Sequence, residues 1–270
     1  MSGLGLFTNY CSLYTVTMSW ASRRRTLYSL AIGSVLVLLI GVPLGMYLYE
    51  QPTCTDGKKN QSETDIDKGG PCTILDERTL AAHATLFVRA FPVRPGEYGV
   101  TAYVQNPNRS AGVSEARYRV SVYDQKNVLI AEREGQTPIM PGGITPVYEP
   151  GIMAGGRTAS RAFFEFTETL VWVSAKADAS SLVVSNTAIR NLDTEPELSA
   201  EVTNTSVATV LNVRYVATLF DAAGDAFASS ETIIPSLGAG KTRTIVFTWP
   251  QAFSVAPARI DVLPVVPFGE

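Results

Sequence analysis

The chain has 270 residues, of which 46% are hydrophobic and 17% are charged, and its formal net charge at neutral pH is −3. A charge this small gives no support to nucleic acid or another polyanion as the partner, because such binding needs a strong excess of basic residues. The only histidine is His83, so the sequence excludes a metal site built from several imidazoles.

The first expected element is an apolar helix. Residues 26–49 carry no charge and directly follow three arginines at positions 23–25. From Leu27 onward this helix would extend about 34 Å, which is enough to cross the hydrocarbon core of a bilayer. Arginines beside a membrane helix stay in the cytoplasm. The pattern predicts a cytoplasmic head at residues 1–25, a transmembrane signal anchor at 26–49, and an extracytoplasmic chain after Tyr49.

A cleaved signal peptide is the competing interpretation of the same segment. Signal peptides usually have an apolar core of about 7–15 residues, followed by a cleavage site flanked by small residues. The apolar run here is longer, and residues 45–52 contain no such site. The sequence therefore favours a single-pass protein of the cell membrane. Residues 18–25 also have the form of a natural start for a signal anchor, which leaves open whether residues 1–17 are translated.

The cysteines divide according to this topology. Cys11 precedes the helix and would lie in the reducing cytoplasm, whereas Cys54 and Cys72 follow it into an oxidising compartment. We therefore expect a disulfide between Cys54 and Cys72. Closing a loop of this length should stabilise the folded chain by about 3 kcal/mol.

Residues 50–83 are polar and glycine-rich, and we call them the neck. Part of the neck resembles a short cysteine module of exported bacterial proteins, Cys-x-Asp-Gly-x-x-Asn-x-x-Glu-x-x-x-Asp-Cys-Gly-Gly-x-Cys. The matching residues are Cys54, Asp56, Gly57, Asn60, Glu63, Asp67, Gly69, Gly70 and Cys72. The chain departs from the module at Lys68, where a cysteine is expected. One bridge between the two remaining cysteines is consistent with that loss.

Oxygen donors are concentrated in the neck. Calcium prefers carboxylate and amide oxygens, and the candidate ligands are Asp56, Asn60, Glu63, Asp65 and Asp67. Their spacing is not that of an EF-hand. A solvated acidic loop is the favoured interpretation, and calcium is the alternative. His83, at the end of the neck, is expected to be structural or exposed. The sequence predicts no other cofactor, no other metal site and no catalytic residue.

The remaining chain is interpreted as two copies of one β domain, at residues 84–177 and 178–270. Residues 117–124 align with 214–221, and in both segments apolar and polar side chains alternate as in a half-buried strand. Tyr118, Val120 and Val122 correspond to Tyr215, Ala217 and Leu219, and are expected to be equivalent core residues.

Turn residues recur at the same offset. Asn127 in the first copy and Gly224 in the second follow the aligned strands, and both residue types readily adopt a left-handed conformation that closes a hairpin. Glycine-containing turns follow at residues 141–143 and 238–240. Agreement between strand pattern and turn chemistry predicts an internal duplication.

The expected fold is mainly β, with one N-terminal transmembrane helix and two tandem β-sandwiches. The order of strand, asparagine-containing loop, aromatic-Asp strand end, hairpin and glycine turn resembles the FxLYD and related immunoglobulin-like modules of bacterial envelope proteins. That resemblance implies an accessory or binding domain, with no catalytic residue to carry over.

One segment has a partial nucleotide-binding pattern. Residues 238–242 read Gly-Ala-Gly-Lys-Thr, but a phosphate-binding loop needs glycine where this chain has Pro235. It also needs a helix after the loop, yet residues 242–249 alternate like a strand. We therefore predict no nucleotide.

The sequence predicts a structural or adhesive protein that is anchored in the membrane and presents β-sandwich modules to an unknown protein partner. A non-catalytic subunit of an envelope complex, such as a secretion or pilus assembly that docks through strand edges, is the second interpretation. An enzyme with an unrecognised pair of carboxylates is the third and least favoured. The segments that differ most between the copies, residues 106–115 and 204–211, are expected to lie on the surface as loops.

Overall fold

The computed structural model describes residues 19–49, 51–175 and 179–268. The chain divides into two compact units, Met1–Pro52 and Thr53–Glu270, and each is described by itself. Cys11 lies outside the described residues, so the expectation for it stays a prediction.

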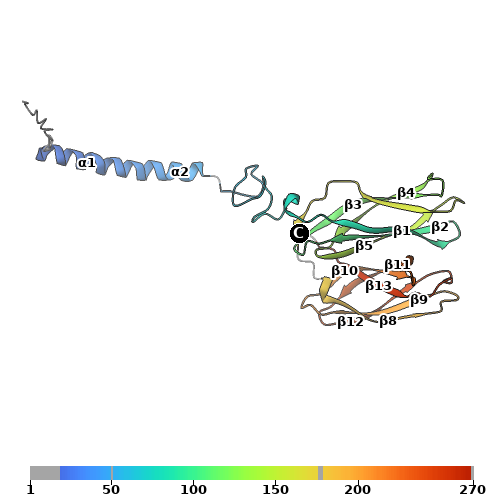
Figure 1. Cartoon of the computed structure of the whole chain (residues 1–270). Coiled ribbons are helices and arrows are strands. Elements are labelled where there is room, and N and C mark those ends of the chain that lie inside the picture. The colour runs from blue at the N-terminus through green and yellow to red at the C-terminus, as the bar shows by residue number, and fades with distance from the viewer. Residues whose placement is uncertain (1–18, 50, 176–178, 269–270) are drawn as a thin grey trace, which may run out of the picture. The chain divides into compact units, whose positions relative to one another are not determined.

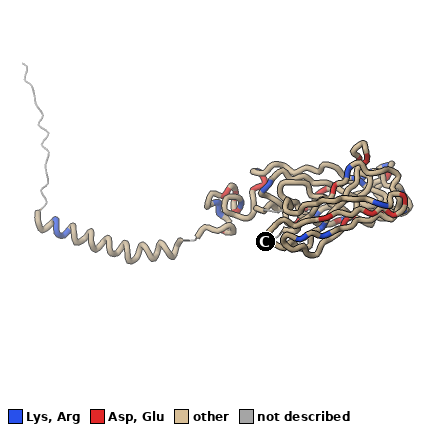
Figure 2. The backbone as a smooth tube through the Cα atoms, turned by 90° about the horizontal axis from the view of Figure 1, so that it is seen from below, with Lys and Arg blue, Asp and Glu red and all other residues tan. Residues whose placement is uncertain are grey.

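The first unit contains one long apolar helix, as expected (Figure 1). It consists of α1 (Trp20–Leu36), the π-helical turn η1 (Val37–Gly41) and α2 (Val42–Leu48). Its 29 residues include an 18-residue window of mean hydropathy 2.3, which is long and apolar enough to cross a membrane and also fits a signal sequence. Figure 2 shows Lys and Arg only near the start of this helix, with no charge along the rest.

The π-helical turn has a local cause. Pro43 has no N–H, so it cannot donate to the carbonyl four residues earlier, and the regular hydrogen-bond ladder is interrupted there. The turn at Val37–Gly41 ends two residues before Pro43 and contains Leu39, whose carbonyl would have accepted that hydrogen bond. A π-helical turn changes the hydrogen-bond spacing without ending the helix, so the apolar segment continues to Leu48.

The second unit begins within the neck, whose residues 53–83 are irregular apart from the short 3-10 helix η2 (Glu77–Thr79). Cys54 and Cys72 form the expected disulfide. Beyond Cys72, the neck lies against the first sandwich. The N–H of Leu75 donates to the carbonyl of Trp172 over 2.8 Å, and the N–H of Ser174 donates to the carbonyl of Thr73 over 2.8 Å. The neck therefore belongs to the folded unit rather than forming a free linker.

Two antiparallel sheets form sandwich 1. Their orders are β1-β2-β5 and β4-β3-β6, with the short β7 also paired to β3. The strands are β1 (Ala84–Arg94), β2 (Glu97–Asn106), β3 (Ala111–Tyr123), β4 (Leu129–Ile139), β5 (Gly143–Met153), β6 (Arg161–Phe166) and β7 (Val173–Ser174). Tyr118, Val120 and Val122 are buried in the core between the sheets, as expected, and Trp172 closes one part of it.

Sandwich 2 has the same strand order. The short 3-10 helix η3 (Ala179–Ser181) precedes it, and its sheets are β8-β9-β12 and β11-β10-β13. The strands are β8 (Leu182–Arg190), β9 (Glu197–Asn204), β10 (Val210–Phe220), β11 (Ala226–Leu237), β12 (Thr242–Thr248) and β13 (Arg259–Val265). Tyr215, Ala217 and Leu219 lie in its core with Trp249.

Details of the hairpins agree between the sandwiches. Asn127 and Gly224 both have positive φ, of 59° and 84°, and they close the β3–β4 and β10–β11 hairpins. In each case a carboxylate oxygen, of Asp124 or Asp221, accepts hydrogen bonds from two backbone N–H groups of the turn. The predicted hairpins are confirmed.

The prediction that residues 106–115 and 204–211 form surface loops is wrong in part. Asn106 and Asn204 are only 1% and 0% exposed. Each side-chain amide donates to backbone carbonyls of its own loop and of the turn that joins the two sheets. Residues from Ala111 onward already belong to β3. These asparagines are structural because they satisfy buried carbonyl groups that have no strand partner.

The two sandwiches pack face to face. Residues Gly99–Val104 of β2 are buried without interruption, and so are Tyr215–Phe220 of β10, because both faces of these strands are covered. The shared core contains Phe91, Tyr103, Phe220 and Ala226. Figure 1 shows the resulting stack, with the β1-β2-β5 sheet lying against the β11-β10-β13 sheet.

Alternate residues of the buried run in β2 belong to different cores. Val100, Ala102 and Val104 lie inside sandwich 1, whereas Tyr103 lies between the sandwiches. Successive side chains of a strand point to opposite faces of its sheet, so each core receives every second residue. The β1-β2-β5 sheet is therefore covered on both sides.

Candidate functional site

The acidic part of the neck is the first candidate site. Asp56 accepts a 2.8 Å hydrogen bond from the side-chain amide of Asn60, which is the main reason that the pKa of Asp56 lies below its usual value. Glu63 accepts from the N–H groups of Asn60 and Asp67 over 3.1 and 3.3 Å. The carboxylate of Asp67 accepts from the N–H of Gly57 over 3.0 Å. Hydrogen bonds therefore tie four of the five predicted calcium ligands into one loop, but among the described residues the carboxylates of Asp56, Glu63 and Asp67 do not form a group with ligand atoms within 4.8 Å of one another.

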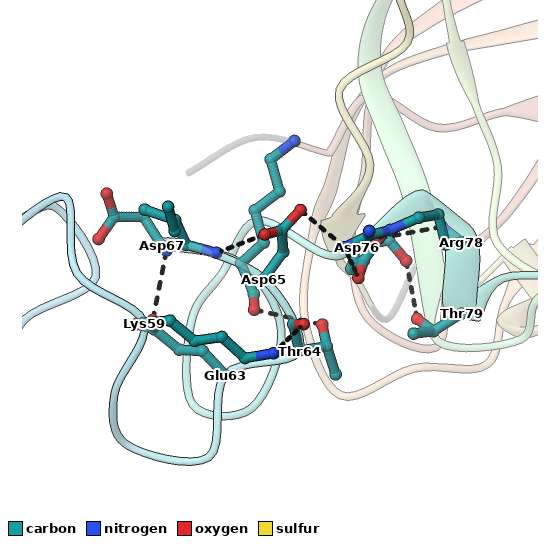
Figure 3. A network of polar contacts seen from close by, with 10 residues as sticks. Lys59, Glu63, Thr64, Asp65, Asp67, Asp76, Arg78 and Thr79 are labelled. Atoms are coloured by element: carbon teal, nitrogen blue, oxygen red, sulfur yellow. Dashed lines mark hydrogen bonds and ion pairs between the residues drawn. The ribbon is translucent and has the colours of Figure 1, made fainter.

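Asp65 is the predicted ligand that does not join this group. Its carboxylate forms a 2.6 Å ion pair with Arg78, which also holds Asp76 over 2.8 Å (Figure 3). Arg78 keeps the pKa of Asp76 at about 2, well below its usual range. Asp76 itself is buried. Asp65 is thus used to fasten the disulfide loop to the segment that leads into sandwich 1.

One oxygen of the acidic group has no partner. Among the described residues, Oδ1 of Asn60 is buried and makes no hydrogen bond. A buried carbonyl oxygen without a partner is unfavourable, so this atom is the best evidence that the loop could take a cation. The carboxylates of Asp56, Glu63 and Asp67 already accept hydrogen bonds from backbone N–H groups. These hydrogen bonds compete with the binding of a cation.

The two sulfur atoms near Glu63 do not extend the site. Cys54, Glu63 and Cys72 offer ligand atoms that lie within 4.8 Å of one another. Both cysteines are in the disulfide, and a metal ligand must be a thiolate. The buried carboxylate of Glu63 therefore packs against the bridge, with Oε1 3.2 Å from Sγ of Cys72.

A second polar group lies where the sandwiches meet. Arg214 of β10 donates to the hydroxyl of Thr137 of β4 over 3.0 Å and faces Glu231 at 4.0 Å. The hydroxyl of Tyr118 donates to Glu149 over 2.9 Å. Burial raises the pKa of Glu231, the charge of Arg214 lowers it, and the nearby charge of Glu149 raises it again. Glu231 is thus affected both by the charge of Glu149 and by the guanidinium of Arg214.

Two clefts in the described part of the chain lie near the junction of the sandwiches. One cleft of about 330 Å³ is lined by Phe91, Ala226 and Trp249 among others, and another of about 310 Å³ by Thr137 and Arg214. Glu149 and Glu231 line neither of them. In this group, the hydrogen bond from Arg214 to Thr137 joins the two sandwiches, while Glu149 and Glu231 bind side chains of their own sandwich.

Sequence reasoning missed the residues of this junction. Arg214 is the one charged residue in the otherwise buried run Val213–Phe220 of β10, and a charge within a buried run is a signal that a sheet face is covered by polar partners. His83 lies apart from both polar groups. Its half-buried ring packs against Phe166 and Trp172, with centroid distances of 5.5 and 5.9 Å, which is a structural role.

Comparisons with known proteins do not identify the chain. No protein-family model matches it, and no curated protein does. Among solved structures, a beta-glucuronidase from Bacteroides uniformis is 14% identical, with 64% of this chain and 22% of that chain covered and a TM-score of 0.19. A beta-glucuronidase from glycoside hydrolase family 2 is 10% identical, with 65% and 21% covered and a TM-score of 0.20. The chain spans less than a quarter of either structure, and likeness this low carries no argument about function.

Proposed function

We propose that this protein is a single-pass membrane protein that holds two β-sandwiches outside the cytoplasm as a structural or adhesive module. The single observation that carries the proposal is the order of parts: an apolar helix of membrane-spanning length, then a disulfide loop, then two sandwiches joined by a common core. A disulfide persists in oxidising compartments, so it favours an extracytoplasmic location for the second unit.

The proposed orientation rests on residues 23–25. These arginines lie at the N-terminal end of the apolar helix, where positive charge favours the cytoplasmic side. The immunoglobulin-like family assignment and the internal duplication are part of the same proposal. The equal strand order of the two sandwiches supports them.

A membrane-impermeant thiol reagent on intact cells tests this topology. After mild reduction, Cys54 and Cys72 should be labelled and Cys11 should not. A Cys11→Ser variant should give the same labelling, and a variant with both neck cysteines changed to serine should give none. Labelling of Cys11 alone, or recovery of a mature chain without the helix, would contradict the proposal.

A subunit of a larger envelope complex is the alternative within the same class. Both versions are non-catalytic, and they differ in whether the chain works alone. Purification from gently solubilised membranes separates them, because a complex subunit should carry stoichiometric partners through a second purification step. A chain recovered without partners favours the structural or adhesive role.

Calcium binding by the neck is a second proposed property, favoured by the unpartnered Oδ1 of Asn60. Titration with calcium should release or absorb heat in the wild type, and Asn60→Ala and Asp67→Asn should abolish it. Asp65→Asn is the matched control, because Asp65 is held by Arg78 and should not matter. No binding heat in the wild type, together with equal protease resistance in calcium and in EDTA, would rule the property out.

A further inference from the structure

The edge strand β12 is the feature that the proposed function does not use. Its seven residues, Thr242–Thr248, pair with β9 in one uninterrupted register. Among the described strands it pairs with β9 alone, so its other edge presents backbone N–H and C=O groups. A regular unpaired edge is a template for a further strand.

The other edge strands are protected. Strands β1, β4, β5, β11 and β13 each contain proline, which removes a backbone donor. Strand β8 has a register shift between Ser185 and Ala188. Two of the six residues of β6, Arg161 and Glu165, are charged, and β7 has only two residues. Within the described sheets, β12 alone combines regular pairing with the absence of proline and with a single charge.

The side chains of β12 are compatible with a second copy of the same strand. Its exposed outward positions are Thr242, Thr244, Val246 and Thr248, and its only charge is Arg243. Antiparallel pairing of two β12 strands brings two arginines together only if the pairing is centred on Arg243. Centres at Thr244, Ile245 or Val246 avoid that repulsion and place threonine and valine opposite one another.

The apolar helix independently favours a second copy. It contains Gly41-Val-Pro-Leu-Gly45, the small-xxx-small spacing that lets two membrane helices approach closely. A side-chain carbon at Gly45 would meet nothing within 4 Å, and one at Gly41 would meet only Val37 at 3.7 Å. A helix contact would hold two chains together and raise the effective concentration of one β12 near another.

We propose that the protein forms a homodimer in which the β12 edges of two copies pair antiparallel. The β8-β9-β12 sheets of the two copies then become one continuous sheet. A two-fold axis perpendicular to this sheet keeps both outer faces on the same side. This proposal rests on the proposed membrane anchoring only because the anchor brings two copies close together. Failure of the β12 pairing can therefore be distinguished from failure of the anchoring.

Cysteine cross-linking tests the pairing and its centre. Thr244→Cys and Val246→Cys are made separately in the full-length chain with Cys11→Ser, and are oxidised in membranes alone and as an equal mixture. A centre at either residue links that variant to itself, and a centre at Ile245 links the two variants to each other. Val183→Cys is the control on the opposite edge of the same sheet and should not cross-link. Equal cross-linking at Val183 would overturn the proposal.

A charge at the edge tests the same contact without a thiol. Val246→Lys should lower the dimer fraction about tenfold, because a charge on an edge strand opposes the addition of a further strand, and a centre at Val246 would also place the two new charges opposite each other. Val183→Lys should leave it unchanged, since the two valines are similarly exposed, at 42% and 46%. Unchanged melting temperatures show that both variants fold. A dimer that survives Val246→Lys but is lost in Gly45→Leu would overturn the proposal, because the helix alone would then hold the copies together. A monomer whose edge binds another protein would also overturn it.

Discussion

Tyr118 and Tyr215 occupy the same position in the same strand of the two sandwiches, but only the hydroxyl of Tyr118 has a partner. Tyr118 donates to Glu149, whereas the buried hydroxyl of Tyr215 makes no hydrogen bond among the described residues. Gly135 lies opposite Tyr118, and a side-chain carbon there would clash with the hydroxyl. Sandwich 1 therefore provides both space and a hydrogen-bond acceptor for the hydroxyl of Tyr118, whereas the equivalent hydroxyl of Tyr215 in sandwich 2 has no partner among the described residues.

Replacing each tyrosine with phenylalanine should therefore give opposite results. Tyr118→Phe leaves a carboxylate without its donor and should lower the free energy of unfolding by about 1–3 kcal/mol. Tyr215→Phe removes a buried, unpartnered hydroxyl and should leave stability unchanged or higher. Urea unfolding of the two variants measures this, and equal losses would contradict the difference.

Removing the rings should destabilise both sandwiches. Tyr118 is 3% exposed and Tyr215 is 0% exposed. Replacing either with alanine should lower the free energy of unfolding by about 3–5 kcal/mol, the range for large buried aromatic side chains. An unchanged melting temperature for both variants would contradict the core assignment.

The disulfide should matter most for the neck. Cys54 and Cys72 are 18 residues apart, and a bridge over this span is worth about 3 kcal/mol by loop-closure entropy. With both cysteines changed to serine, limited proteolysis should cut within the loop first. The sandwiches should keep their melting temperature, because their cores do not include the bridge. Equal cleavage rates with and without the bridge would show that the loop is held by its other contacts.

Acid should loosen the contact between the disulfide loop and the segment around Asp76 that leads into sandwich 1. The pKa of Asp76 is lowered to about 2, so its ion pair with Arg78 contributes stability above the ordinary value of 3.8 and loses it as pH falls through about 2. Pepsin should therefore cleave the loop only when the pH falls to about 2. Arg78→Gln should move cleavage to higher pH, and Arg94→Gln, at an exposed arginine elsewhere, should not.

Glu231 should respond in the opposite direction. Its pKa is raised by burial, so the ionised form weakens the fold at neutral pH, and this loss disappears as pH falls below the ordinary value of 4.5. Glu231→Gln should raise the melting temperature at about pH 7.5, with a smaller difference in acid. Glu134→Gln, at an exposed carboxylate paired with Arg119, is the control. A lower melting temperature in Glu231→Gln would show that the attraction to Arg214 outweighs burial.

Much of the fold could be predicted because it depends on local chemistry. The apolar helix, the cysteine pair and the left-handed residues Asn127 and Gly224 are each visible in a few neighbouring residues. The alternation around Tyr118 and Tyr215 correctly marks core positions, since it reflects which side of a strand faces the core.

The junction could not be predicted in this way. Thr101 and Thr218 look like solvent-facing positions in an alternating strand, yet both are 0% exposed. Their burial depends on the packing of one sandwich on the other, which is a long-range property of the fold. The same holds for Asp65, whose partner Arg78 is fixed only once the loop is folded.

The contact of the neck with β7 has a mechanical consequence. Thr73 and Ser174, at the two chain ends of sandwich 1, are joined by a backbone hydrogen bond, and Leu75 and Trp172 by another. Tension between the neck and sandwich 2 is then applied to both strands of this short ladder at the same end, so its hydrogen bonds open in sequence like a zipper. While the ladder holds, the core of sandwich 1 is not stretched from one chain end to the other.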